Sequence, residues 1–169
     1  MTAVATLAAG VWQADLTRTS ASFQVGNLGR KAHGTVPVTA GSVEIGEDGQ
    51  LTGVHGTLDL GAIDTGIAKR DQDLRKPGLL DLDRHPTMTF TATSCRPAPN
   101  GWEVTGTLQA RGTSTELSGV VELSTADGET VMTATARLDR RTLGIKAPRF
   151  LIGAFVDITV TAVIRTGVR

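Results

Sequence analysis

The stretch GWEVTGTLQARGTSTELSGVVEL, residues 101–123, decides the fold. Trp102, Val104 and Leu108 fall on one side of a two-residue repeat, and the second half of the stretch resumes that repeat from Leu117. Apolar side chains at every second position are typical of strands with one buried face. The stretch therefore predicts two β-strands, each with one apolar and one polar face.

The same repeat runs through most of the chain on both sides of this stretch. Alternating apolar positions occur in SASFQVG, HGTVPVTAGSVEI, LTGVHGTLDL, TMTFTAT, VMTATARL and FVDITVTAVI. Together with the opening stretch they predict eight or more half-buried strands.

Short connections with Asp-Gly or Asn-Gly separate several of these strands, at residues 46–50, 98–102 and 126–130. Such pairs favour tight reversals, so neighbouring strands should form antiparallel hairpins. No long helical crossover separates the strands, and a long meander removes its exposed edges by closing on itself. We expect an all-β fold, an eight-stranded antiparallel up-and-down barrel, with a β-sandwich as the second choice.

One connection differs from the rest: AIDTGIAKRDQDLRKPGLLDLDRHP, residues 62–86. Between Ile67 and Leu80 a few apolar residues lie among crowded charges, a pattern that predicts one or two turns of amphipathic helix. Pro77 and Gly78 should end or kink this helix. A short helix in a long inter-strand connection can lie across the mouth of a barrel as a plug or a lid.

Composition narrows the functional classes. The 169 residues are 40% hydrophobic, which fits one domain over residues 1–169 with its core at about 11–165. The 17 basic and 17 acidic side chains cancel, so we expect neither nucleic acid nor an anionic membrane as partner. Cys95 is the only cysteine, which excludes an intrachain disulfide and a cysteine cluster for zinc.

The sequence carries no signal for export or membrane insertion. The first residues lack a basic start, and no segment reaches the roughly 20 apolar residues that span a bilayer. We expect a frayed N-terminal lead-in, no integral membrane segment, and a cytoplasmic location.

Catalytic patterns are weak. The nucleophile elbow, the dinucleotide fingerprint and the Walker motif are all absent. Arg70, Asp71 and His85 offer an acid-base cluster, but charges at such a corner are more often ion-paired or solvated. For Asp64 and Thr65 we expect a capping or turn role. No catalytic residue is assigned, although an enzyme acting on a lipophilic substrate stays open.

Metal and nucleic-acid sites have little support. His33, His55 and His85 are the only histidines, and none pairs with another at a short ligand spacing. The chain has no tyrosine and four phenylalanines, too few for the aromatic platforms of single-strand binders. We therefore expect no metal site and no cofactor beyond a bound lipid.

Four fragments, in order and spacing, carry a resemblance to a known family: WQADLTRTSASFQVGNLG (12–29), DTGIAKRDQDLRKPGLLDLDRHPTMTF (64–90), GTLQARGTSTELSGVVEL (106–123) and RRTLGIKAPRFLIGAFVDITV (140–160). The chain resembles the YceI-like polyisoprenoid-binding proteins from about Val11 to Ile164. The most specific part is the series that begins at Asp64.

The resemblance implies a lipocalin-like barrel that binds, stores or transports the apolar chain of an amphiphile, a polyisoprenoid, an isoprenoid quinone or a fatty-acid derivative, without catalysis. Arg70 and Asp71 would anchor the helical connection, with Asp64 and Thr65 as further structural polar residues. The residues expected to face the ligand are Phe23, Val25, Val36, Leu58, Leu74, Leu80, Met88, Phe90, Leu108, Leu117, Val121, Phe150, Ile152 and Val160.

The chain departs from the family pattern at four positions. Arg18 and Asn27 stand where relatives typically carry histidine, and Leu79 and Leu80 stand where they carry phenylalanine. Fewer aromatic side chains imply a wider or softer cavity. Two questions stay open: whether side chains fill the barrel, which would make it an interaction or stress-response module without ligand, and whether the chain forms a homodimer.

Overall fold

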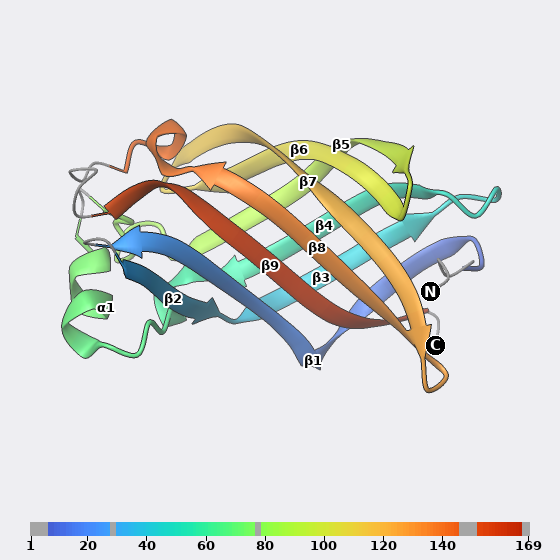
Figure 1. The fold of residues 1–169 in the computed structure, drawn as a ribbon, viewed down its shortest axis with the longest axis horizontal. Coiled ribbons are helices and arrows are strands. Elements are labelled where there is room, and N and C mark those ends of the chain that lie inside the picture. The colour runs from blue at the N-terminus through green and yellow to red at the C-terminus, as the bar shows by residue number, and fades with distance from the viewer. Residues whose placement is uncertain (1–6, 28–29, 77–78, 146–151, 167–169) are drawn as a thin grey trace.

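The computed structural model describes residues 7–27, 30–76, 79–145 and 152–166. Within them the chain is mostly strand, with one short α-helix, α1, and two 3-10 turns, η1 and η2 (Figure 1). The elements are β1 Gly10–Asn27, β2 Arg30–Val36, β3 Val38–Ile45, β4 Leu51–Asp59, η1 Leu60–Ala62, α1 Ala68–Leu74, β5 Thr87–Ala98, β6 Gly101–Ala110, β7 Thr113–Ala126, β8 Glu129–Asp139, η2 Arg140–Leu143 and β9 Ile152–Thr166.

The strands form one closed antiparallel barrel, as predicted. Neighbours in the sheet follow the order β2-β1-β3-β4-β5-β6-β7-β8-β9, and β1 also pairs with β9. Only Pro37 separates β2 from β3, and both pair with β1. Because β2 and β3 act as one broken strand, the barrel is eight-stranded. The pairing of β1 with β9 closes the sheet, which overturns the sandwich alternative.

Among the described connections, tight turns join the strands where the sequence predicted them and at one further place. The predicted reversals connect β3 to β4, β5 to β6 and β7 to β8. The turn between β6 and β7 was not predicted; there Arg111 and Gly112 have φ of 57° and 69°. Asp127 and Gly128 adopt the same paired positive φ, 54° and 77°. Two positive values match the type I′ turn, whose twist suits a hairpin.

The helix α1 has seven residues, about the two turns that the sequence predicted, and lies at one end of the barrel. It begins after Ile67 and ends at Leu74, before Pro77. Figure 1 shows it at the left end, away from the beginning of β1 and the end of β9. Ile67 is the N-cap residue and makes no side-chain cap hydrogen bond, so of the two roles expected for Asp64 and Thr65, capping or a turn, capping of this helix is not seen.

The interior is divided into two clusters along the barrel axis. One, the packed end, includes Leu7 and Trp102, exposed by 8% and 4%, and the indole Nε1 of Trp102 donates to Gln50 Oε1 at 3.0 Å. Burial of Leu7 corrects the expectation of a frayed lead-in at that residue. The other cluster lies under α1 and η2 and includes Leu82 and Leu143.

Candidate ligand-binding cavity

A large cavity of about 510 Å³ occupies the α1 end of the barrel. It is lined by side chains from β1, β2, β4, β5, β8, β9, η2 and the connection around α1. Its volume lies in the range of ligand pockets, roughly 300–1,000 Å³. Among the residues predicted to face the ligand, those that line this cavity are Phe23, Val25, Val36, Leu58, Leu74, Leu80 and Met88.

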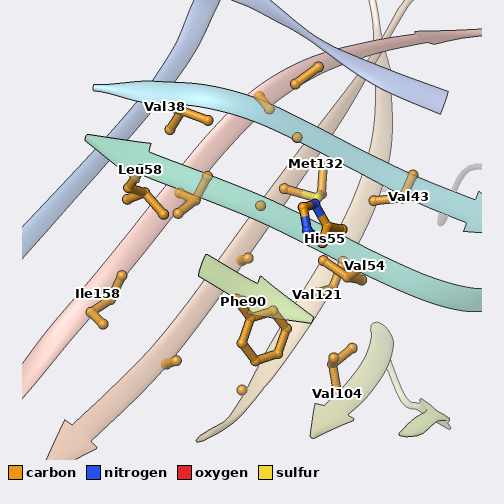
Figure 2. A pocket seen from close by; sticks show the side chains of 18 of the residues that line it. Val38, Val43, Val54, His55, Leu58, Phe90, Val104, Val121, Met132 and Ile158 are labelled. Atoms are coloured by element: carbon orange, nitrogen blue, oxygen red, sulfur yellow. The ribbon is translucent and has the colours of Figure 1, made fainter. Parts of the chain in front are cut away.

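A second, inner cavity of about 150 Å³ lies deeper in the barrel (Figure 2). The two cavities share Leu58, Met88 and Ile158 in their linings, so they meet at these side chains. Predicted residues found only in the inner lining are Phe90, Leu108, Leu117, Val121 and Val160. Both cavities argue against an interior filled by its own side chains.

Two of the predicted ligand residues cannot be placed. Phe150 lies outside the described residues. Ile152 begins β9, but its side chain is not described. Their predicted contact with a ligand stays a prediction.

The inner cavity exists because small residues meet in neighbouring strands. Gly41 of β3 pairs with Gly56 of β4, and Gly119 of β7 pairs with Ala136 of β8. Ala134 lines the same space. Each of these residues faces the barrel interior in the two-residue repeat, but it is too small to fill the space there. The sequence pattern did not identify these residues as cavity-lining, because ligand-facing residues were predicted only at inward positions with large apolar side chains.

Thr65 anchors the connection before α1 to the helix itself. Its backbone N–H donates to Asp71 Oδ1 at 3.0 Å, and its hydroxyl donates to the same oxygen. Arg70 donates from Nε to Thr65 Oγ1 at 3.0 Å and from Nη2 to the Thr65 carbonyl at 2.8 Å. Asp64 Oδ1 accepts the Gly66 N–H at 2.8 Å, as in a turn. Thr65 therefore donates to Asp71 rather than capping the helix.

Replacing Asp71 with alanine should loosen this connection. The change leaves the Thr65 N–H and hydroxyl without their charged acceptor, and hydrogen bonds to charged groups contribute about 2 kcal/mol. We expect a loss of about that size in the free energy of urea unfolding, with faster amide exchange over residues 64–74. The control is Asp73→Ala, which removes only surface ion pairs with Lys69 and Lys76 and should cost less than about 1 kcal/mol. Equal losses in the two variants would contradict the anchor.

The turn η2 supplies further cavity residues and has its own cap. Asp139 Oδ1 accepts the Arg141 N–H at 3.0 Å, while the guanidinium of Arg141 reaches both carboxylate oxygens. Arg140 and Leu143, both buried, line the large cavity from this turn. The side-chain hydrogen bond from Arg141 is the main cause that lowers the pKa of Asp139 to about 2.

This depressed pKa predicts an acid-dependent part of stability. The contribution of Asp139 should be present above its ordinary pKa of 3.8 and lost as the pH falls toward about 2. Between about pH 4 and about pH 2, the melting temperature of Asp139→Asn should therefore fall less steeply than that of the unchanged protein. Parallel curves would contradict the assignment.

The positions of the described residues give no support to the alternative catalytic site or to a metal site. Arg70 lines the large cavity, but Asp71 and His85 are not among its lining residues. Within the described parts of the chain, no group of His, Cys, Asp and Glu side chains could hold a metal ion. Burial raises the pKa of the Cys95 thiol, which disfavours its reactive thiolate.

No helix among the residues that the structure describes is both long and apolar enough to cross a bilayer.

The closed antiparallel barrel with an apolar interior defines a protein of the lipocalin-like class. The profile of the YceI-like domain matches residues 12–164. The chain belongs to the YceI-like family.

Relatives of known structure share the fold at low sequence identity. BcnA of Burkholderia cenocepacia has a TM-score of 0.80 at 16% identity, with 90% of this chain and 99% of that chain covered. A polyisoprenoid binding domain from Saccharophagus degradans has a TM-score of 0.67 at 14% identity, covering 92% and 98%.

A curated relative matches over a shorter stretch. A UPF0312 protein of Pectobacterium atrosepticum is 34% identical over 59 residues, 35% of this chain. The match spans 31% of that relative's length, about a third.

Proposed function

We propose that this protein binds one long apolar amphiphile inside its barrel, for storage or transport and without catalysis. The proposed ligand class is a polyisoprenoid, an isoprenoid quinone or a fatty-acid derivative. The observation that carries the proposal is a pair of adjoining cavities, about 510 and 150 Å³, with almost wholly apolar walls.

The distribution of polar groups supports an amphiphile with one polar end. The charged residues in the cavity linings belong to the large cavity: Lys69, Arg70 and Asp73 on α1 and Arg140 on η2. Deeper in the barrel the side chains are mostly aliphatic. A hydrocarbon chain would therefore occupy the inner space, with its polar head left beside α1.

Transfer of the chain from water would drive binding. Burial of apolar surface contributes about 25 cal/mol per Å², less the cost of ordering the ligand. Affinity should therefore increase with chain length while the chain still fits. The family, and the polyisoprenoid binding domain among the structural relatives, support the same ligand class.

The test is mass spectrometry of freshly purified protein, first under native conditions and then after extraction with organic solvent, with mock-purified material as control. We expect one discrete lipid, bound in stoichiometric amount. The native spectra also report whether the protein is a monomer or a homodimer.

Charges placed in the cavity wall should abolish lipid retention. Leu74 and Leu80 line the large cavity, so carboxylates from Leu74→Asp and Leu80→Asp would have to be buried beside a hydrocarbon chain. We expect at least a tenfold loss of co-purifying lipid. The matched control is Val11→Asp, an exposed apolar position outside both linings, which should retain it. An unmodified protein that is empty and also rejects added quinones and fatty acids would refute the carrier proposal.

A further inference from the structure

The wall of the barrel is interrupted between β1 and β3. β1 pairs with β3 from Gly10 to Gln13 and with β2 from Ala21 to Asn27. Both facing segments, 14–20 and 37–41, are described throughout, and no strand pairing joins them. Figure 1 shows β1 turning a corner in its middle.

Surplus residues in β1 cause this interruption. Between its pairs with β9, β1 advances from Ala14 to Thr19 while β9 moves only from Ile164 to Ala162. A strand with surplus residues bends away from its neighbours. Pro37 on the opposite side has no N–H to donate, and its carbonyl accepts from Asp59 of β4 instead.

Hydrogen bonds hold the bulge in this shape. Asp15 Oδ1 accepts the Thr17 N–H at 3.1 Å and the Thr17 hydroxyl at 2.7 Å. The Thr19 hydroxyl donates to the Asp15 carbonyl at 2.7 Å, and Arg165 of β9 pairs with the Asp15 carboxylate. The interruption is therefore a defined local structure.

The inner cavity extends to the edges of this interruption. Ala14 and Thr19 of β1 line it from one side, and Val38, Ala40 and Gly41 of β3 line it from the other. Most of these side chains are small, and Ala40 is exposed as well as cavity-lining. Mostly small side chains therefore lie between the inner cavity and the surface along this unpaired stretch of wall.

The end of the barrel beyond the inner cavity is closed by large buried side chains. Leu51, Trp102 and Leu123 pack there in the buried core cluster, each exposed by 4% or less. A chain that enters beside α1 and fills both cavities meets this packed end ahead of it and the interrupted wall at its side.

We propose that the interruption between residues 14–20 and 37–41 is a lateral window, through which the far end of a long apolar chain leaves the barrel. The inference rests on the proposed binding of an amphiphile. Leu16, 46% exposed on the bulge, lies in the segment that borders the window and offers apolar surface to an emerging chain.

The window has a measurable consequence for chain length. If the barrel had no window, its affinity for an apolar chain would increase about three- to fourfold per methylene until the cavity is full. The affinity for still longer chains would then fall sharply. With a lateral window, affinity increases and then reaches a plateau, because further methylenes pass into water instead of clashing.

The experiment measures binding of dodecanoic, hexadecanoic and docosanoic acid by isothermal titration to delipidated protein. Photolabelling with docosanoic acid that carries a diazirine at its last carbon then locates the chain end by peptide mass spectrometry. We expect docosanoic acid to bind at least as tightly as hexadecanoic acid, with labels on residues 14–20 or 37–41.

A matched pair of variants tests the window itself. Ala40→Trp places a large ring at a window residue that lines the cavity, and Glu116→Trp places it at an exposed strand position outside both linings and outside the window. We expect Ala40→Trp to weaken docosanoic acid at least tenfold more than it weakens dodecanoic acid, with no effect of Glu116→Trp on either acid. Two results would refute the window but not the proposed ligand binding: photolabels at Leu51, Trp102 or Leu123, or much weaker binding of docosanoic than of hexadecanoic acid to the unmodified protein. Absence of binding by all three acids would overturn the window together with the carrier proposal for this ligand class.

Discussion

Gly119→Val is expected to destabilise the barrel by at least about 3 kcal/mol, and enough to prevent folding in part of the expressed protein. A Cβ at this position would lie 2.3 Å from the Thr135 carbonyl oxygen and 3.0 Å from the Ala136 Cβ. The first of these atoms belongs to the backbone of β8, so relief requires β7 and β8 to separate. Urea unfolding followed by circular dichroism measures the loss.

The control for this prediction is Gly56→Val. Gly56 lines the same inner cavity, but a Cβ there meets only the Ala40 carbonyl oxygen at 4.0 Å, an ordinary contact. Valine suits a strand better than glycine, so stability should stay unchanged or increase. If both variants lost stability equally, the loss would reflect any added volume in the cavity rather than the close approach of two strands.

Trp102→Ala is expected to cost about 3–5 kcal/mol of unfolding free energy. The indole is 4% exposed and packs among the buried side chains of the packed end, where its removal leaves a large void. The protein has a second tryptophan, Trp12, with an indole that donates to the Ala8 carbonyl. Unfolding should therefore be followed by circular dichroism rather than by tryptophan fluorescence.

Trp102→Phe separates packing from hydrogen bonding at this site. The smaller ring keeps most of the apolar contact but loses the hydrogen bond to Gln50, worth about 1 kcal/mol. We expect Trp102→Phe to lose less than half of the unfolding free energy that Trp102→Ala loses. If the phenylalanine variant were as unstable as the alanine variant, the hydrogen bond, and not the packing of the ring, would be the main source of stability at this end of the barrel.

The sequence predicted the barrel because its strands follow one strong local rule. Apolar residues at every second position assign each side chain to one face, and closure makes that face the interior. All the predicted ligand-facing residues with described side chains accordingly line one of the two cavities. Whether they touch a ligand stays a prediction.

Other features depend on contacts that a local pattern does not encode. Gly119 lines a cavity because of what lies across from it in β8, and a single strand does not reveal its partner. The turn at Arg111 and Gly112 lacks the Asp-Gly or Asn-Gly pair that identified other reversals. The bulge at Asp15 follows from the register between β1 and β9, which alternation alone leaves undetermined.

The two-part interior separates the residues that keep the fold from those that would choose a ligand. Trp102 and its buried neighbours Leu51 and Leu123, which line neither cavity, supply dense apolar contacts whether or not the cavities are occupied. Under the proposed function, substitutions under α1 would change the choice of ligand while the packed end keeps the fold. Such a scaffold suits diversification and redesign, because the side chains around the large cavity can be replaced without a new fold.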